Sequence, residues 1–178
     1  MSATHTETAP TRQNLTPAEF LFTDLEQELA ATRRVLERFP EGKGDWRPHD
    51  KSRTLGELAT HVAELSGLGA MVLQAPFMDV TQRQKLSPAN SASELLAIFD
   101  ERAARLRNAV ASVDFDALEQ PWSFRRGDQV VFSAPRRAML RTLYFNHIIH
   151  HRAQLGVYYR LLGVPVPITY GPTADEAF

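Results

Sequence analysis

The chain has 178 residues, of which 43% are hydrophobic and 23% are charged, and its formal net charge is -1. This balance is that of one globular domain with a substantial core, and it argues against the broad positive surface by which proteins bind nucleic acid or an anionic membrane. The chain has no cysteine, which excludes disulfides and thiolate ligands and fits a cytoplasmic protein. We therefore expect a metal site to use histidine and carboxylate side chains, and a reacting thiol to come from the substrate.

The first elements in the chain are a tail and a long helix. Residues 1–14 hold no apolar run, so we expect a disordered N-terminal tail and neither a signal peptide nor a membrane anchor. A capping box at Thr16, with Pro17 at the first helical position, begins a helix. Apolar residues at steps of three and four continue this helix to Phe39, and Pro40 ends it.

Two more helices begin at further capping boxes. The box Thr54-Leu55-Gly56-Glu57 begins a helix that ends before Pro76. A box at Ser91 begins another helix, whose apolar face continues to Val113. A polar connection, from about Asp79 to Asn90, joins the two helices.

The last helix begins near Ser133 and Pro135 and runs to Leu162, before Gly163. Its apolar residues lie on more than one face, which predicts a central position. Gly-Asp between short aromatic and β-branched runs, within residues 122–132, indicates a small β-hairpin just before it. Together these patterns predict an all-α fold, a four-helix bundle over residues 15–165, followed by an extended C-terminal tail at 166–178.

Three of the six histidines lie within residues 147–151. On a helix, residues i and i+4 face the same way, so His147 and His151 can both reach one ion. The pair His147 and His150 competes with this pair, but the stripe that contains His147 favours His151. The members of that stripe are Leu140, Leu143, His147, His151, Gln154 and Tyr158.

His61 lies between Leu58 and Leu65 on the apolar face of the second helix, so we expect it to face the interior. There it can join His147 and His151, and three protein ligands leave positions open for water or substrate, as in catalytic metal sites. A single inward histidine is more often a hydrogen-bonded core residue, so a bundle without metal is an alternative. No Glu follows the first histidine, which argues against the H-E-x-x-H protease motif.

Several segments together resemble the DinB-like family of metal-dependent enzymes. They are DWRP at 45–48, SRTLGEL at 52–58 with His61, NHIIHHRAQL at 146–155, and residues 158–167. The resemblance covers nearly the whole chain after residue 15, and N-H-x-x-H-H-R-x-Q-L is its most specific part. One departure is Ala153, where the family usually has Gly.

The resemblance implies a four-helix bundle in up-down-down-up order. It also implies one divalent metal ion on His61, His147 and His151, with nickel or zinc favoured and manganese or iron as alternatives. It implies a thiol-dependent S-transferase or a hydrolase acting on a small molecule, with a low-molecular-weight thiol such as bacillithiol or mycothiol as cosubstrate, and a homodimer. The alternative is a non-enzymatic metal-binding or dimeric interaction protein.

No residue stands out as the catalytic acid or base. Glu57 and Glu64 flank His61 and are weak candidates, although the capping box is the stronger explanation for Glu57. Arg152 and Tyr158 are weak candidates near the last histidine, with hydrogen bonding and core packing as their ordinary roles.

Overall fold

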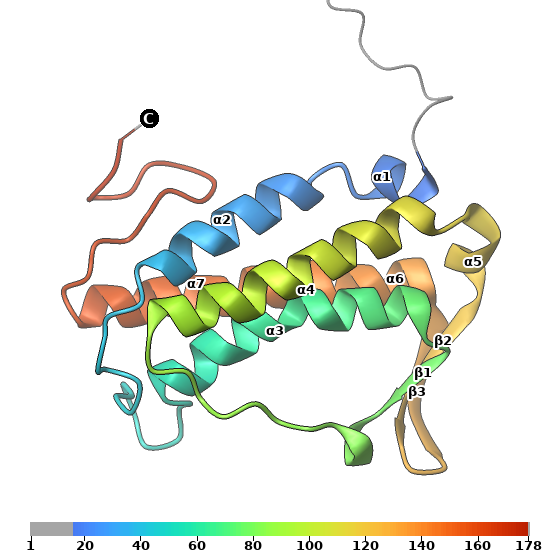
Figure 1. The fold of residues 1–178 in the computed structure, drawn as a ribbon, viewed down its shortest axis with the longest axis horizontal. Helices are drawn as coiled ribbons and strands as arrows, with labels where there is room; N and C mark the ends of the chain where they lie inside the picture. The colour runs from blue at the N-terminus through green and yellow to red at the C-terminus, as the bar shows by residue number, and fades with distance from the viewer. Residues whose placement is uncertain (1–15, 178) are drawn as a thin grey trace, which may run out of the picture.

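The computed structural model describes residues 16–177, so the tail predicted for residues 1–14 lies outside the described residues. Within this range the protein is mostly helical, with a small three-stranded sheet at one end (Figure 1). None of the described helices combines the length and the apolar character that a membrane span requires.

The long helical segments lie side by side and share one apolar core (Figure 1). They are α2 (Leu25–Glu37), α3 (Leu55–Gln74), α4 (Ala92–Ser112) and a last segment made of α6 (Arg136–Leu140), the π-helical turn η3 (Arg141–Asn146) and α7 (His147–Leu161). Shorter helices are α1 (Pro17–Leu21), η2 (Val80–Gln82) and α5 (Phe115–Glu119). The strands are β1 (Phe77–Asp79), β2 (Pro121–Arg126) and β3 (Gln129–Pro135).

The prediction of one continuous first helix was wrong, because the chain bends between α1 and α2. Phe22 lies at the bend, is buried, and stacks on Phe145 with 5.0 Å between ring centroids. The bend lets α1 pack against α4 and α5 while α2 packs against α4 and α7. The apolar periodicity continues across the bend, so the sequence pattern does not reveal it.

The capping box predicted at the start of α3 is present in full. The Glu57 backbone N–H donates to the Thr54 hydroxyl at 3.2 Å, and the Thr54 N–H donates to the Glu57 carboxylate at 2.7 Å.

The irregular segment 83–91 runs along the outside of α3 (Figure 1). The Ala89 N–H of this segment donates to the Thr60 hydroxyl at 2.8 Å. At Gly56 a Cβ would lie only 2.7 Å from the Ala89 carbonyl oxygen, so glycine permits this close contact.

The predicted hairpin is confirmed, and it belongs to a larger sheet. Strands β2 and β3 pair antiparallel, and Gly127 in the turn between them has a φ of 57°. Trp122 on β2 is fully buried and attaches the sheet to the core. Strand β1 pairs with β2 in parallel, a contact that the polar character of the connection near Asp79 did not indicate.

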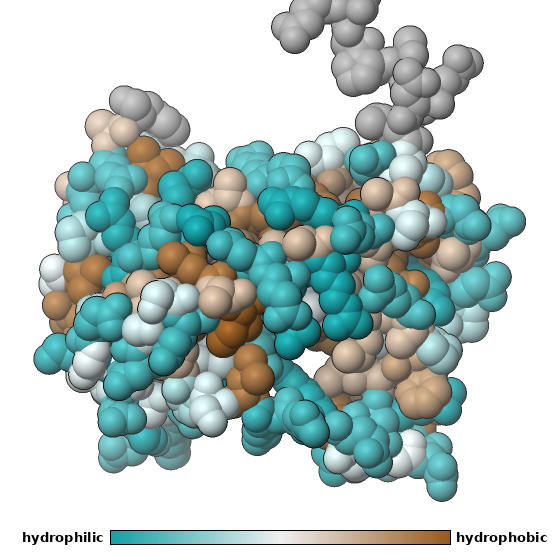
Figure 2. All heavy atoms as spheres, viewed as in Figure 1, coloured by the Kyte–Doolittle hydropathy of each residue, from teal (hydrophilic) through white to brown (hydrophobic). Residues whose placement is uncertain are grey.

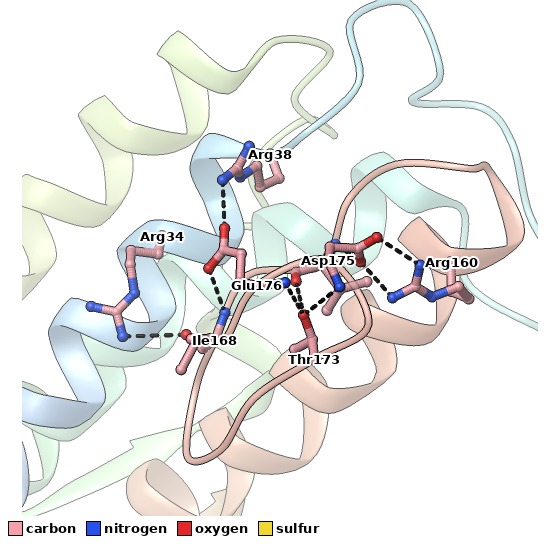
Figure 3. A network of polar contacts seen from close by, with 8 residues as sticks. Arg34, Arg38, Arg160, Ile168, Thr173, Asp175 and Glu176 are labelled. Carbon is pink, nitrogen blue, oxygen red and sulfur yellow. Dashed lines mark hydrogen bonds and ion pairs between the residues drawn. The ribbon is translucent and has the colours of Figure 1, made fainter. Parts of the chain in front are cut away.

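Up to residue 177, the segment that follows α7 contains no helix or strand, but it lies against the helices. Glu176 accepts hydrogen bonds from the Arg38 guanidinium at 2.8 Å and from the Ile168 N–H at 2.9 Å (Figure 3). Asp175 pairs with Arg160 of α7 (Figure 3). The segment is therefore attached to α2 on one side and to α7 on the other.

Beneath this segment lies a buried ion pair between α7 and α2. Arg152 is 3% exposed, and its guanidinium lies 2.8 Å from the Glu28 carboxylate. The same guanidinium donates to the Thr32 hydroxyl at 3.1 Å and to the Tyr170 hydroxyl at 2.7 Å. Tyr170 in turn donates to Glu28 at 2.7 Å, which closes the network.

Replacing Arg152 by methionine should destabilise the protein, because Glu28 would stay buried without its partner. We expect the free energy of unfolding to fall by about 3–5 kcal/mol in urea denaturation followed by circular dichroism. The double variant Glu28→Leu with Arg152→Met should recover much of this loss, because it leaves no buried unpaired charge. A loss below about 1 kcal/mol in Arg152→Met would contradict a structural role for the pair.

Candidate metal centre

Three histidines from two helices meet at one point. His61 lies on α3, and His147 and His151 lie one turn apart on α7. The ring centroids are 5.0 Å apart for His61 and His147, and 4.7 Å apart for each of the other two pairs. One ligand nitrogen from each ring lies within 4.8 Å of the others, close enough for a shared metal ion.

His61 is buried, as predicted, but His147 and His151 are only half-buried. The residues of the last helix that face the core differ from the predicted stripe. Both sets begin at Leu140, but each later residue of the buried set follows its predicted counterpart by one position. The buried set consists of Leu140, Tyr144, Ile148, Arg152, Leu155 and Tyr159. The expectation that the His147–His151 stripe faces the interior therefore needs correction. The two rings lie at the edge of the core, where a ligand can approach from solvent.

Hydrogen bonds orient the two rings on α7. The Nδ1 atom of His147 donates to the Leu143 carbonyl at 3.3 Å, and the Nδ1 atom of His151 donates to the Gln154 side-chain oxygen at 2.7 Å. Because these oxygens only accept, both neutral rings carry their proton on Nδ1 and present a free Nε2. The Nε2 atom of His147 lies 3.2 Å from that of His61, so these two nitrogens face each other.

Gln154 flanks His151 on the predicted stripe, and hydrogen bonding within the bundle is its ordinary expected role. The structure instead shows its side chain bonded to a site histidine. Its spacing of three residues from His151 was the available signal, because residues i and i+3 are neighbours on a helix.

All three histidines favour the neutral state. Burial, with Arg53 nearby, lowers the pKa of His61 to about 3. Burial also lowers the pKa of His147 and that of His151. Near pH 7 the rings are therefore unprotonated, which is the form that binds a metal ion.

His150, the competing residue, does not join the group. It is exposed, and its ring contacts His151 with 4.8 Å between centroids. Among the described residues, the group with metal-binding geometry contains His61, His147 and His151. The structure thus selects the i and i+4 pair over the i and i+3 pair.

A hollow of about 320 Å³ opens beside His61, between α3 and the segment 83–91. Its charged lining consists of Arg53, Glu57, Glu64, Arg83 and Lys85, so cations outnumber carboxylates. The hollow therefore favours a ligand with negative charge.

The two acidic candidates line this hollow, but both have partners. The Thr54 N–H holds the pKa of Glu57 below its usual range, which keeps this side chain ionised and in the capping box. Glu64 forms an ion pair with Arg83 at 3.1 Å.

The other two candidates are engaged in structural contacts. Arg152 is held in its buried network with Glu28. The Tyr158 hydroxyl donates to the Arg53 carbonyl at 3.2 Å, and its ring packs edge-on against Trp46 at 5.5 Å. Neither contact involves a metal-site histidine.

Comparison with solved structures identifies several proteins with this fold. A DinB-like protein from Bacillus subtilis is 18% identical, with a TM-score of 0.65 over 84% of this chain and 96% of that chain. A DinB-like protein from Bacillus cereus ATCC 10987 is 20% identical, with a TM-score of 0.65 over 85% and 97%. A protein assigned to the DinB family from Exiguobacterium sibiricum 255-15 is 19% identical, with a TM-score of 0.62 over 87% and 98%. At these identities the likeness shows the fold alone.

A search of curated proteins finds no match. The model of the DinB family, in contrast, matches residues 12–177. This match spans the helices that carry all three site histidines and agrees with the fold likeness. The chain belongs to the DinB family.

Proposed function

We propose that this protein is a metal-dependent enzyme that holds one divalent ion on His61, His147 and His151. The observation that carries the proposal is the meeting of three neutral imidazoles from two helices, within 4.8 Å of one another. Imidazole ligands without thiolates suit nickel or zinc, with manganese or iron as alternatives. A bound ion would lower the pKa of a water molecule or of a substrate thiol, and so supply a nucleophile near neutral pH.

The chain's own residues would prepare the site for this chemistry. The Leu143 carbonyl and the Gln154 side chain hold the two α7 rings with Nε2 facing the ion. The hollow beside His61 would receive the reacting end of the substrate, and Arg53, Arg83 and Lys85 would stabilise negative charge on that end. Glu64 and Glu57 line the same hollow and stay the candidates for proton transfer.

The reaction class that we propose is S-transfer with a low-molecular-weight thiol, or hydrolysis of a small molecule. The chain has no cysteine, so a thiol nucleophile would come with the substrate. The four-helix bundle in up-down-down-up order and the homodimer that the resemblance implies belong to this proposal. So does the cytoplasmic location, which the absence of cysteine fits. The shared core of the long helical segments supports the bundle.

The metal proposal predicts which histidine variants lose affinity. We expect Gln154→Ala to weaken zinc binding by about 10- to 100-fold, because it releases the ring of His151. His61→Ala and His151→Ala should each lose more than this, because each removes a ligand. His150→Ala is the matched control and should bind zinc like the unmodified protein.

These affinities are measured on untagged protein by competition with a fluorescent zinc chelator. The proposed ligand set would be wrong if His150→Ala weakened binding as much as His151→Ala does. It would also be wrong if His61→Ala retained the full affinity.

The lowered pKa values predict little proton release when metal binds. At pH 6.5, three histidines with an ordinary pKa near 6.5 would together release about 1.5 protons. In this protein the pKa of each of the three rings is lowered. At pH 6.5 the three rings therefore hold fewer protons than ordinary histidines would. We expect calorimetry of zinc binding, in buffers of different ionisation enthalpy, to show clearly less than about 1.5 protons released. Release of that full amount would contradict neutral rings.

Activity is tested with a panel of bacillithiol and mycothiol adducts and simple esters, each with nickel, zinc and manganese. The enzyme proposal predicts turnover of at least one substrate, and loss of this turnover in His151→Ala while circular dichroism shows an unchanged fold. Metal binding without turnover of any substrate would instead favour a non-enzymatic metal-binding protein.

A further inference from the structure

A second and larger hollow, of about 570 Å³, adjoins the one beside His61. It lies between α3, α4 and the segment formed by β1 and η2, and Figure 2 shows the surface hollowed between the helical body and that segment. We call it the α3–α4 groove. Glu64 and Arg83 line both hollows, and their ion pair stands at the boundary between them.

One side of the α3–α4 groove is apolar. Its apolar lining includes Leu65, Leu68, Met71, Phe77 and Met78. Phe77 is 40% exposed although it lies on a strand that joins the sheet. An apolar wall in a hollow of this volume suits the body of a small organic molecule.

The α4 wall of the groove carries two arginines whose guanidinium groups keep unused N–H donors. Arg102 and Arg105 lie three residues apart on α4, and both line the groove. Arg102 forms an ion pair at 3.4 Å with the exposed Glu101 through one Nη atom, and Arg105 donates from Nε to the neutral amide of Gln74 at 3.3 Å. By contrast, Arg107 on the same helix makes a bidentate pair with Glu26 at 2.7 and 2.8 Å.

The acidic residues of the groove do not neutralise these arginines. Asp79 accepts hydrogen bonds from the Thr81 and Gly127 N–H groups at 2.9 and 3.0 Å. Glu64 is paired with Arg83. The guanidinium groups of Arg102 and Arg105 thus keep donors for a ligand, and a carboxylate is the planar anion that matches them.

Gly67 on α3 gives an independent reason to regard Arg102 as built into the groove. A Cβ at this position would lie 2.8 Å from Cδ of Arg102. A glycine inside a helix is destabilising by about 0.5–1 kcal/mol relative to alanine. Here it leaves room for the arginine stem to lie directly against the helix.

We propose that the α3–α4 groove binds a small carboxylic acid with an apolar body, and that this acid is the substrate of the neighbouring metal centre. The apolar body would lie against Leu68, Met71 and Phe77, and the carboxylate would bind Arg102 and Arg105. The substrate role rests on the proposed function. The groove itself is formed by residues other than the three histidines.

The test uses 4-phenylbutyrate as the probe and 4-phenylbutylamine, which has the same apolar body, as its matched control. Binding to the full-length, metal-free protein is followed by nuclear magnetic resonance titration. We expect the amine to bind at least about tenfold more weakly than the acid, because it cannot accept from the arginines. Arg102→Gln and Arg105→Gln should each weaken binding of the acid about tenfold.

Arg107→Gln is the matched control variant, since it removes the same charge from the other side of α4 and should leave binding unchanged. Gly67→Ala should weaken binding by displacing Arg102, with an unchanged circular dichroism spectrum. Equal binding of the acid and the amine would overturn the proposal. So would equal effects of Arg102→Gln and Arg107→Gln.

Parallel zinc titrations separate this proposal from the metal proposal. His151→Ala should lose zinc and still bind 4-phenylbutyrate, which would support a groove independent of the metal ligands. Zinc binding without 4-phenylbutyrate binding would overturn the groove alone. Binding of 4-phenylbutyrate in a protein that takes up no divalent ion would overturn the metal centre, and with it the substrate role of the acid.

Discussion

The candidate site depends on how closely α3 packs against the last helical segment. The two elements contribute all three histidines, so their separation decides whether the rings meet. At Gly69 a Cβ would lie 3.0 Å from the Tyr144 ring and 3.1 Å from Leu106, so a larger residue would push α3 away from both neighbouring helices. His61 lies about two turns earlier on the same helix. The capping box at Thr54 fixes where this helix begins.

The electrostatics of the site follow from its place at the edge of the core. Burial keeps the three imidazoles neutral without removing them from solvent on the open side. The cationic side chains around the adjoining hollows would repel a bare metal ion, but they favour an anionic ligand once the ion is bound. The cationic side chains thus surround the space for a substrate, whereas the imidazole nitrogens surround the space for the metal ion.

Sequence patterns predicted the features that depend on neighbouring residues. The capping box at Thr54, the N-cap at Ser91, the hairpin around Gly127 and the facing pair His147 and His151 are all local. At Ser91 the Glu94 carboxylate accepts from the Asn90 N–H, so the second half of the predicted box does not form. The patterns did not predict features that depend on distant contacts. At the bend, Phe22 stacks on Phe145, which is far away in the sequence. The parallel pairing of β1 and the attached C-terminal segment join parts of the chain that are far apart in sequence.

The π-helical turn of Arg141–Asn146, immediately before His147, lets one long helix satisfy two different alignments. α6 must follow the orientation that the sheet imposes, while α7 must point its rings at α3. A π turn holds an extra residue, and each residue of an α-helix turns it by about 100°. If the same residues were wound as a regular α-helix, α7 would therefore be rotated by roughly that angle relative to α6. The turn thus sets the rotation of α7, which carries His147 and His151, relative to α6, which packs against the sheet.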